Sequence, residues 1–143
     1  MSFIGIFIQQ SLQVANTTTT IEKPLVYSCS GCSSAAQMAN YLAIKMDREG
    51  IAEMSCIAGV GGNVKKLVRT ALSGRKIIAI DGCPLACSKA CLNNHNISPD
   101  VHVELTRFGV RKKQHQDFDI EEAGRVLAEI TKNPLLYDTK ETC

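Results

Sequence analysis

After an N-terminal segment, the chain alternates between short apolar runs and longer stretches with a helical spacing of apolar residues. Residues 76–80 are a continuous aliphatic run, which is typical of a parallel strand covered on both faces. Residues 24–28 form another short apolar run. In 52–57 and 101–105 apolar and polar residues alternate, which predicts strands with one face partly exposed. The pattern therefore predicts four strands, of which the first and third are the most apolar.

Apolar residues recur at helical spacing after the predicted strands. In the first such stretch Ser34 and Gln37 make a capping box and Gly50 makes a stop, which predicts a helix between them. In the second, Asn63 is expected to cap a helix over 64–72 that ends before the next glycine.

Two further helices complete the pattern. Pro84 is well placed as the first residue of a short helix that runs to about Asn93. Asp119 and Glu122 make a start that is similar to a capping box for a last helix. Residues 107–118, which precede it, are expected to form a polar loop.

Four strand–helix units in succession predict an α/β fold, a three-layer sandwich in which helices cover both faces of a mostly parallel sheet. Right-handed crossovers limit the strand orders that such a chain can adopt. With the two most apolar strands in the centre, the expected order is 2-1-3-4, as in flavodoxin-like or Rossmann-like sheets. The first strand then lies between the second and the third.

The same pattern divides the chain into three parts. Residues 1–23 are expected to be an N-terminal arm with a Thr-rich linker, 24–133 the α/β domain, and 134–143 a C-terminal tail. The apolar run of the arm, residues 3–8, is shorter than a secretory signal or a membrane span requires. We therefore expect a cytoplasmic protein with no membrane partner.

Composition and charge narrow the class of protein. Hydrophobic residues make up 45% of the 143 residues and charged residues 21%, as is typical of a soluble globular domain. The formal net charge is only +2, and the basic residues are scattered apart from the short run 111–113. Nucleic acid is therefore not an expected partner, and nothing here predicts a protein partner or an oligomer.

Seven cysteines set this sequence apart from an ordinary domain of its size. Three of them lie in the segment DGCPLACSKAC (81–91), each four residues from the next, and Cys29 and Cys32 form a CxxC. An odd number of cysteines in a cytoplasmic protein favours free thiols or metal ligands over a set of disulfides. No Walker A, GxGxxG or GxSxG motif accompanies them.

The predicted topology brings several of these thiols to one edge of the sheet. In open α/β sheets, ligands bind beyond the carboxyl ends of the strands, at the point where strand order reverses. Cys29 follows the first strand, Cys56 ends the second and Cys83 follows the third. Cys87 comes one helical turn after Cys83, and helical side chains lean back towards the N-terminus. These four thiols are therefore the expected metal ligands.

The other chemistry-bearing residues carry different expectations. Cys91 is a further turn along its helix and is expected on the helix face or in the core, while Cys143 falls in the tail. Asp81 is expected to accept backbone N–H bonds rather than to orient a ligand. Glycines in the same loops keep the edge free of side chains. No histidine pairs with a cysteine by helical or strand spacing, which disfavours a mixed Cys/His site.

The segments YSCSGCSSA, SCIAGVGG and AIDGCPLACSKACL, in this order and separated by predicted helices, resemble the DGC domain family of small prokaryotic proteins. The resemblance covers about residues 24–131. Family members often lack a thiol at the position of Cys32, so the resemblance does not count Cys32 among the ligands and leaves it free for another function. The resemblance implies a zinc-binding protein without an assigned reaction, and the family's cysteines match Cys29, Cys56, Cys83 and Cys87.

Three functions stay open from the sequence. The leading hypothesis is a metal-binding protein with one Zn²⁺ held by four thiolates. Such a site is structural or a metal store if its coordination is closed, and hydrolytic if water takes one position. The same ligands suit an iron–sulfur cluster for electron transfer. The third hypothesis is a thiol/disulfide oxidoreductase that uses Cys29 and Cys32. A phosphatase-like use of Cys29 is disfavoured, because residues 33–37 contain no arginine.

Overall fold

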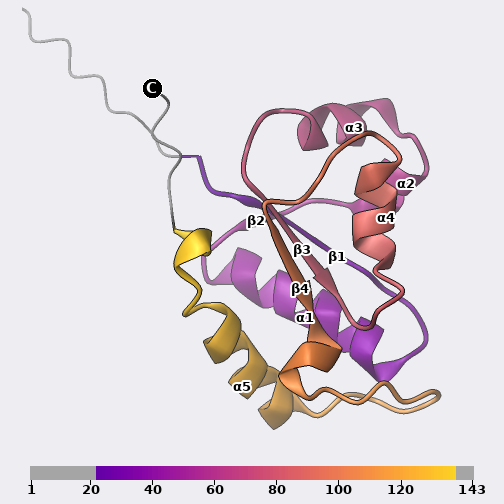
Figure 1. The fold of residues 1–143 in the computed structure, drawn as a ribbon, viewed down its shortest axis with the longest axis vertical. Coiled ribbons are helices and arrows are strands. Elements are labelled where there is room, and N and C mark those ends of the chain that lie inside the picture. The colour runs from indigo at the N-terminus through magenta and orange to yellow at the C-terminus, as the bar shows by residue number, and fades with distance from the viewer. Residues whose placement is uncertain (1–21, 138–143) are drawn as a thin grey trace, which may run out of the picture.

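The computed structural model describes residues 22–137, in which helices lie on both sides of a four-stranded sheet (Figure 1). The strands are β1 (Leu25–Ser28), β2 (Glu53–Met54), β3 (Ile77–Asp81) and β4 (Val101–Glu104). The α-helices are α1 (Ser34–Arg48), α2 (Ile57–Gly61), α3 (Lys65–Ala71), α4 (Cys87–Asn93) and α5 (Ile120–Ile130). Two 3₁₀ turns are η1 (Leu105–Phe108) and η2 (Pro134–Leu136). The predicted arm and linker lie almost wholly outside the described residues, as does the end of the predicted tail.

All strand pairs are parallel, and the order is β2-β1-β3-β4, as the sequence predicted. β1 pairs with β3 from Leu25 opposite Ile77, and both strands are buried along their whole length. In β4 buried and half-buried residues alternate, which confirms its predicted position near an edge. β2 is only two residues long, so the strand predicted over 52–57 was too long, because the chain leaves the sheet before Cys56 and enters α2.

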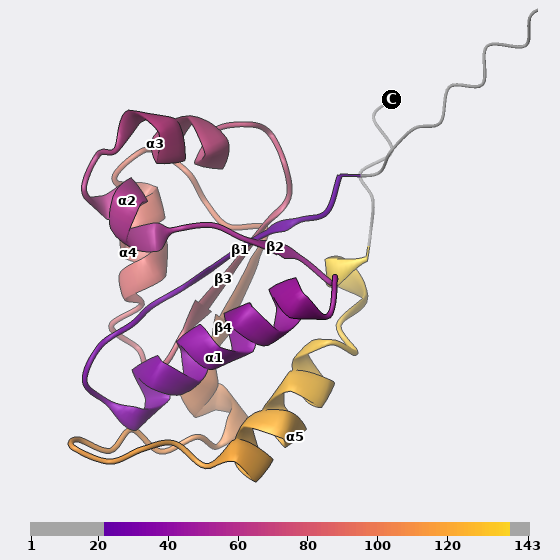
Figure 2. The same ribbon diagram turned by 180° about the vertical axis from the view of Figure 1, so that it is seen from behind.

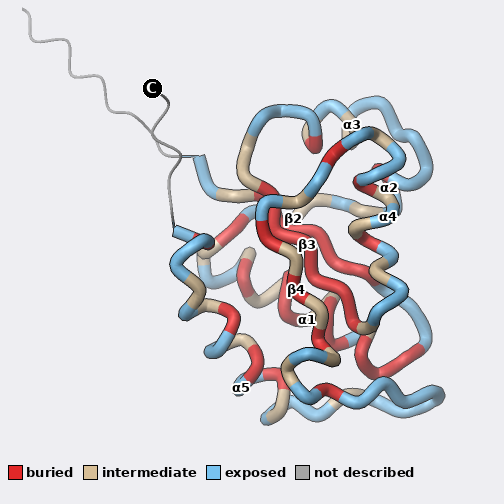
Figure 3. The backbone as a smooth tube through the Cα atoms, viewed as in Figure 1, coloured by how far each residue is buried: buried red, intermediate tan, exposed pale blue. Residues whose placement is uncertain are grey.

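Two apolar cores lie on the two faces of the sheet. Beneath α1 and α5, helix residues such as Met38 and Leu42 pack with Ile78 and Ile80 of β3. On the other face, covered by α2, α3 and α4, Tyr27 of β1 packs with residues of the helices. Figure 2 shows α1 and α5 on the side opposite α2, α3 and α4, and Figure 3 shows the sheet as the most buried part of the chain. The three-layer α/β prediction is therefore confirmed.

Side-chain caps begin two of the helices. Asp119 accepts a hydrogen bond from the Glu122 N–H at 2.7 Å, which confirms the predicted start of α5. The cap of α1 is Ser33, whose Oγ accepts from the Ala36 N–H at 3.3 Å, so the cap lies one residue before the predicted Ser34. Gly50 follows α1 with a positive φ of 74°, as expected of a helix stop.

Two local predictions were wrong, and one helix was not predicted. Asn63 does not cap α3: it takes a left-handed conformation with φ of 59°, and Val64 precedes the helix instead. The glycine-rich segment before it forms the helix α2, because the buried Val60 packs into the second core and this packing overrides the poor helix propensity of glycine. Pro84 does not begin α4, which starts at Cys87 after the left-handed Ala86.

Two smaller differences concern the end of the chain. The loop predicted over 107–118 begins inside η1, and the tail predicted from residue 134 begins with η2, whose Leu136 is buried in the first core. Between residues 22 and 137, no helix combines the length and the apolar character that a membrane crossing needs.

Candidate functional site

The carboxyl ends of β1, β2 and β3 meet at one edge of the parallel sheet, and each is followed by a loop that carries cysteine. We call this region the thiol edge; it comprises Cys29, Cys32, Cys56, Cys83 and Cys87. All of its cysteines are free thiols. Cys29 is buried, Cys83 is half-buried, and the remaining three are exposed.

Asp81, the last residue of β3, fixes the start of α4. Its side chain is fully buried and accepts hydrogen bonds from the backbone N–H groups of Ser88 at 2.8 Å and Lys89 at 3.3 Å. His102 Nε2 on β4 lies 2.9 Å from the second carboxylate oxygen. The carboxylate thus caps the helix from the neighbouring strand. The expectation that Asp81 accepts backbone N–H bonds is confirmed, and the turn with Cys83 is held at both ends.

Gly82 is required by the close approach of α1. A Cβ atom at this position would lie 2.6 Å from the carbonyl carbon and oxygen of Ala35 and 2.8 Å from the nitrogen of Ala36. These backbone atoms belong to the first turn of α1, so a side chain at Gly82 would push the helix away from the sheet. The Gly82 N–H donates a hydrogen bond to the sulfur of Cys29 at 3.2 Å. The glycine therefore joins the loop after β3 to the loop after β1.

Cys29 is the buried thiol of the edge, with only 8% of its surface exposed. The pKa of Cys29 is raised from about 9 to about 11; burial is the largest cause, and the hydrogen bond from Gly82 acts in the opposite direction. Negative charge on Asp81, Cys87 and Cys83 makes smaller contributions to the same rise in pKa. Two of the other predicted ligands, Cys87 and Cys83, thus contribute to the pKa of Cys29.

Cys56 and Cys91 lie on the α2–α4 side. Cys56 precedes α2, and its side chain makes no capping hydrogen bond. Burial raises the pKa of Tyr27, and the charge of Cys56 makes a smaller contribution to this rise. Cys91 is half-buried in α4, where a Cβ on Gly61 of α2 would lie only 2.9 Å from its sulfur. Burial, followed by Cys87 and Asp81, raises the pKa of Cys91. Cys91 is thus a thiol of the contact between these helices.

A second segment, which the sequence did not single out, covers part of the thiol edge. Residues 110–118, which we call the strap, run beside the start of α1 and form a β-bridge between Ser33 and Gln114. The Ser34 N–H donates to the Lys113 carbonyl at 2.9 Å, and the Lys113 N–H donates to Ser34 Oγ at 3.0 Å. These bonds hold the strap against the loop that follows β1.

Two side chains of the strap reach the thiols. Lys112 Nζ lies 3.5 Å from the sulfur of Cys83, and the thiol of Cys32 lies 3.4 Å from the Gln114 side-chain oxygen. Cys83 and Cys32 belong to different loops, so the strap spans the edge from the β3 loop to the β1 loop. The strap therefore forms one side of the site, where the Lys112 ammonium group and the Gln114 side-chain oxygen contact thiols.

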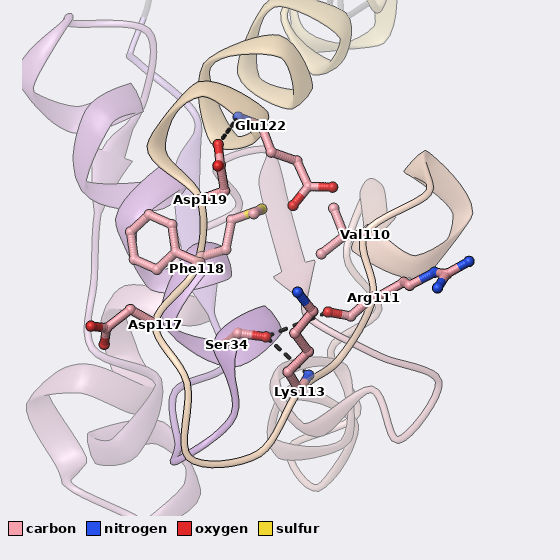
Figure 4. A pocket seen from close by; sticks show the side chains of 9 residues that line it. Ser34, Val110, Arg111, Lys113, Asp117, Phe118, Asp119 and Glu122 are labelled. Carbon is pink, nitrogen blue, oxygen red and sulfur yellow. Dashed lines mark hydrogen bonds between the residues drawn. The ribbon is translucent and has the colours of Figure 1, made fainter.

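A cavity of about 280 Å³ lies on the other side of the strap, between the strap and the first turns of α1 and α5 (Figure 4). Its lining is mostly polar and includes Ser34, Lys113 and Glu122, with Phe118 as an apolar wall. None of the predicted metal ligands lines it. The cavity and the thiol edge are thus separated by the strap.

The side chains as they lie do not form a ready metal centre. Within residues 22–137, no three or more His, Cys, Asp or Glu side chains are arranged so that they could hold a metal ion. Cys83 and Cys87 contribute to the pKa of Cys29, Cys56 contributes to the pKa of Tyr27, and the thiol of Cys32 contacts Gln114.

A profile of the DGC domain matches residues 25–130. The chain belongs to the DGC domain family. This DGC-family chain is 52% identical over 109 residues to the "Anaerobic and virulence modulator AnvM" of Pseudomonas aeruginosa (strain PAO1). The matched segment covers 76% of the chain and 83% of that relative. No solved structure matches the chain.

The site of this DGC-family chain contains residues that the sequence reasoning missed. The sequence spacing predicts no pairing of a histidine with a cysteine, and it does not predict that His102 Nε2 lies 2.9 Å from the Asp81 carboxylate. The contact with Asp81 depends on the register of β4, in which His102 lies opposite Ala79, two residues before Asp81. Lys112 belongs to a basic run that was treated as a solvated loop. The sequence carries no local signal for its contact with Cys83, because that contact depends on the strap's position.

Proposed function

We propose that this DGC-family chain is a metal-binding protein that holds one Zn²⁺ through the thiolates of Cys29, Cys56, Cys83 and Cys87. Thiolate sulfur is the preferred donor of structural zinc sites, which take four ligands. The observation that carries the proposal is the hydrogen bond from the Gly82 N–H to the sulfur of the buried Cys29 at 3.2 Å, which joins the turn that bears Cys83 to the loop that follows β1. Cys56 immediately precedes α2, and α2 packs against α4, in which Cys87 is the first residue.

The chemistry of these donors fits zinc. The raised pKa of Cys29 keeps this thiol protonated at neutral pH, so a metal has to displace its proton and binding releases protons to solvent. Cys83 is half-buried and Cys87, the first residue of α4, is exposed, so a metal ion can reach both thiols from solvent. When bound, zinc would supply a cross-link between the loops that follow β1, β2 and β3.

The frame around the thiols supports a site that is organised in advance. Asp81 fixes the start of α4, and Gly82 holds the same turn against α1, so that the backbone carrying Cys83 and Cys87 is already positioned. A binding site on such a frame loses less conformational entropy when its ligand arrives. The relative's printed name describes a modulator, which favours a regulatory use of the bound metal over a metabolic reaction.

The dithiol alternative receives less support from the same residues. A thiol attacks as its thiolate, and the pKa of about 11 leaves Cys29 almost fully protonated at neutral pH. Cys32 makes its described contact with Gln114. The raised pKa of Cys29 therefore argues against this thiol as a redox nucleophile.

The test is elemental analysis of the full chain, purified anaerobically without added metal, with zinc, iron and sulfide counted per chain. We expect about one zinc per chain. Cys83→Ser and Cys56→Ser should each lower the zinc content strongly, whereas Cys32→Ser, the matched control on the same edge, should leave it unchanged. Iron with matching sulfide would replace zinc by an iron–sulfur cluster. A chain without metal, with all thiols free to titrate, would overturn the proposal.

A further inference from the structure

The strap presents alternate residues to its two sides. In an extended segment, residues two apart point to the same side and their neighbours to the opposite one. Lys112 and Gln114 accordingly reach the thiols of Cys83 and Cys32, whereas Lys113 extends into the cavity on the far side (Figure 4). The β-bridge and the paired hydrogen bonds to Ser34 hold the strap in this orientation. Lys112 is thus aimed at sulfur by the backbone of the strap.

Lys112 is the charged side chain that contacts Cys83. The turn 82–87 consists of glycine, cysteine, proline, leucine and alanine and carries no charged side chain. The carboxylate of Asp81 lies beneath the turn, where it is fully buried and engaged by His102 and by the start of α4. The Lys112 ammonium group therefore lies where a small molecule approaches the half-buried Cys83 and attracts anions to this sulfur.

We propose that Lys112 is the specificity-determining residue of the thiol edge, and that its ammonium group makes Cys83 selective for small anions over neutral molecules of the same size. The site would accordingly take carboxylate-bearing or other oxyanionic ligands and thiol reagents. This inference goes beyond the proposed function, since the contact between Lys112 and Cys83 exists whether or not the thiols hold a metal.

The test compares two alkylating agents of similar size at Cys83 in the full chain after treatment with a chelator. Iodoacetate is an anion and iodoacetamide is neutral. With either, a bond forms between sulfur and carbon, the carbon–iodine bond breaks, iodide leaves with the electron pair, and the thiol proton goes to solvent. Tandem mass spectrometry locates the product on Cys83. The ratio of the two rates at one pH cancels the fraction of thiolate and reports the local charge.

We expect Lys112→Gln to lower the iodoacetate-to-iodoacetamide ratio at Cys83 by about three- to fivefold at low ionic strength. Lys112→Arg should retain the wild-type ratio, and salt should reduce the difference between the variants. Lys113→Gln, which removes a cation on the cavity side of the same strap, is the matched control and should change the ratio little. Urea unfolding of each variant confirms that the fold is kept.

Two results would overturn the proposal: a ratio that Lys112→Gln leaves unchanged, or an equal fall in the Lys113→Gln control. The second result would assign the selectivity to the net charge of the whole segment. Neither result depends on zinc, because the chain is stripped of metal before alkylation. A chain that binds no zinc but keeps the Lys112 effect would therefore refute the proposed function and leave this inference standing.

Discussion

Gly82→Ala is the substitution whose effect follows most directly from the geometry. The new Cβ would lie 2.6 Å from the backbone of Ala35, and ordinary contact begins at 3.4 Å, so α1 has to withdraw by about 0.8 Å. Overpacking of this kind costs about 1–3 kcal/mol, and backbone atoms that cannot rotate away place this case at the upper end. Alanine also lowers the conformational entropy of the unfolded chain, which stabilises the fold by about 0.4–1 kcal/mol. We expect a net destabilisation of about 2 kcal/mol.

Urea unfolding, followed by circular dichroism, measures this loss. With a slope of about 2 kcal/mol per molar urea, the midpoint should fall by about 1 M. Gly124→Ala is the control, because Gly124 lies exposed in α5 and a Cβ there meets no atom within 4 Å. That variant should gain about 0.5–1 kcal/mol from better helix propensity. A Gly82→Ala chain that unfolds at the wild-type midpoint or above it would refute the reasoning.

Three further changes test other parts of the frame. Asp81→Ala should cost about 2–4 kcal/mol in urea unfolding, because it removes a buried carboxylate that caps α4, and Asp81→Asn should cost less. The pKa of Cys29 is higher in the native than in the unfolded chain, so the metal-free protein should lose roughly 2 kcal/mol of stability as pH rises from about 9 to about 11. This loss should be absent from the pH profile of Cys29→Ala. Gly61→Ala should destabilise by about 1 kcal/mol, and combining it with Cys91→Ala should remove most of that cost; additive effects would contradict the close contact.

Strand order was predictable because the sequence separates buried strands from half-buried ones. Ile77–Asp81 is apolar up to its last residue, as a central strand has to be, whereas Val101–Glu104 alternates. The length of β2 was not predictable from pattern alone. Cys56 continues an alternation that reads as a strand, yet the chain turns there into a helix that is stabilised by contacts with α4.

The site was predictable only in part, because spacing along the chain reports neighbours within one element. The sequence pattern predicted that Asp81 accepts backbone N–H bonds and that several cysteines follow the carboxyl ends of the strands. The partners that complete the site come from elements distant in sequence. Lys112 is 29 residues from Cys83, and Gln114 is 82 residues from Cys32. Such contacts depend on the path of a loop, which hydrophobic periodicity does not encode.

Cys29 is a thiol of the edge and also a member of the core beneath α1. Whatever binds this sulfur in the native chain alone adds its binding free energy to the stability of the whole fold by mass action. Proteases cleave opened chains, so occupancy of the thiol edge would set how long the protein survives in a cell. The lifetime of the protein would then depend on whether a ligand is bound at the thiol edge.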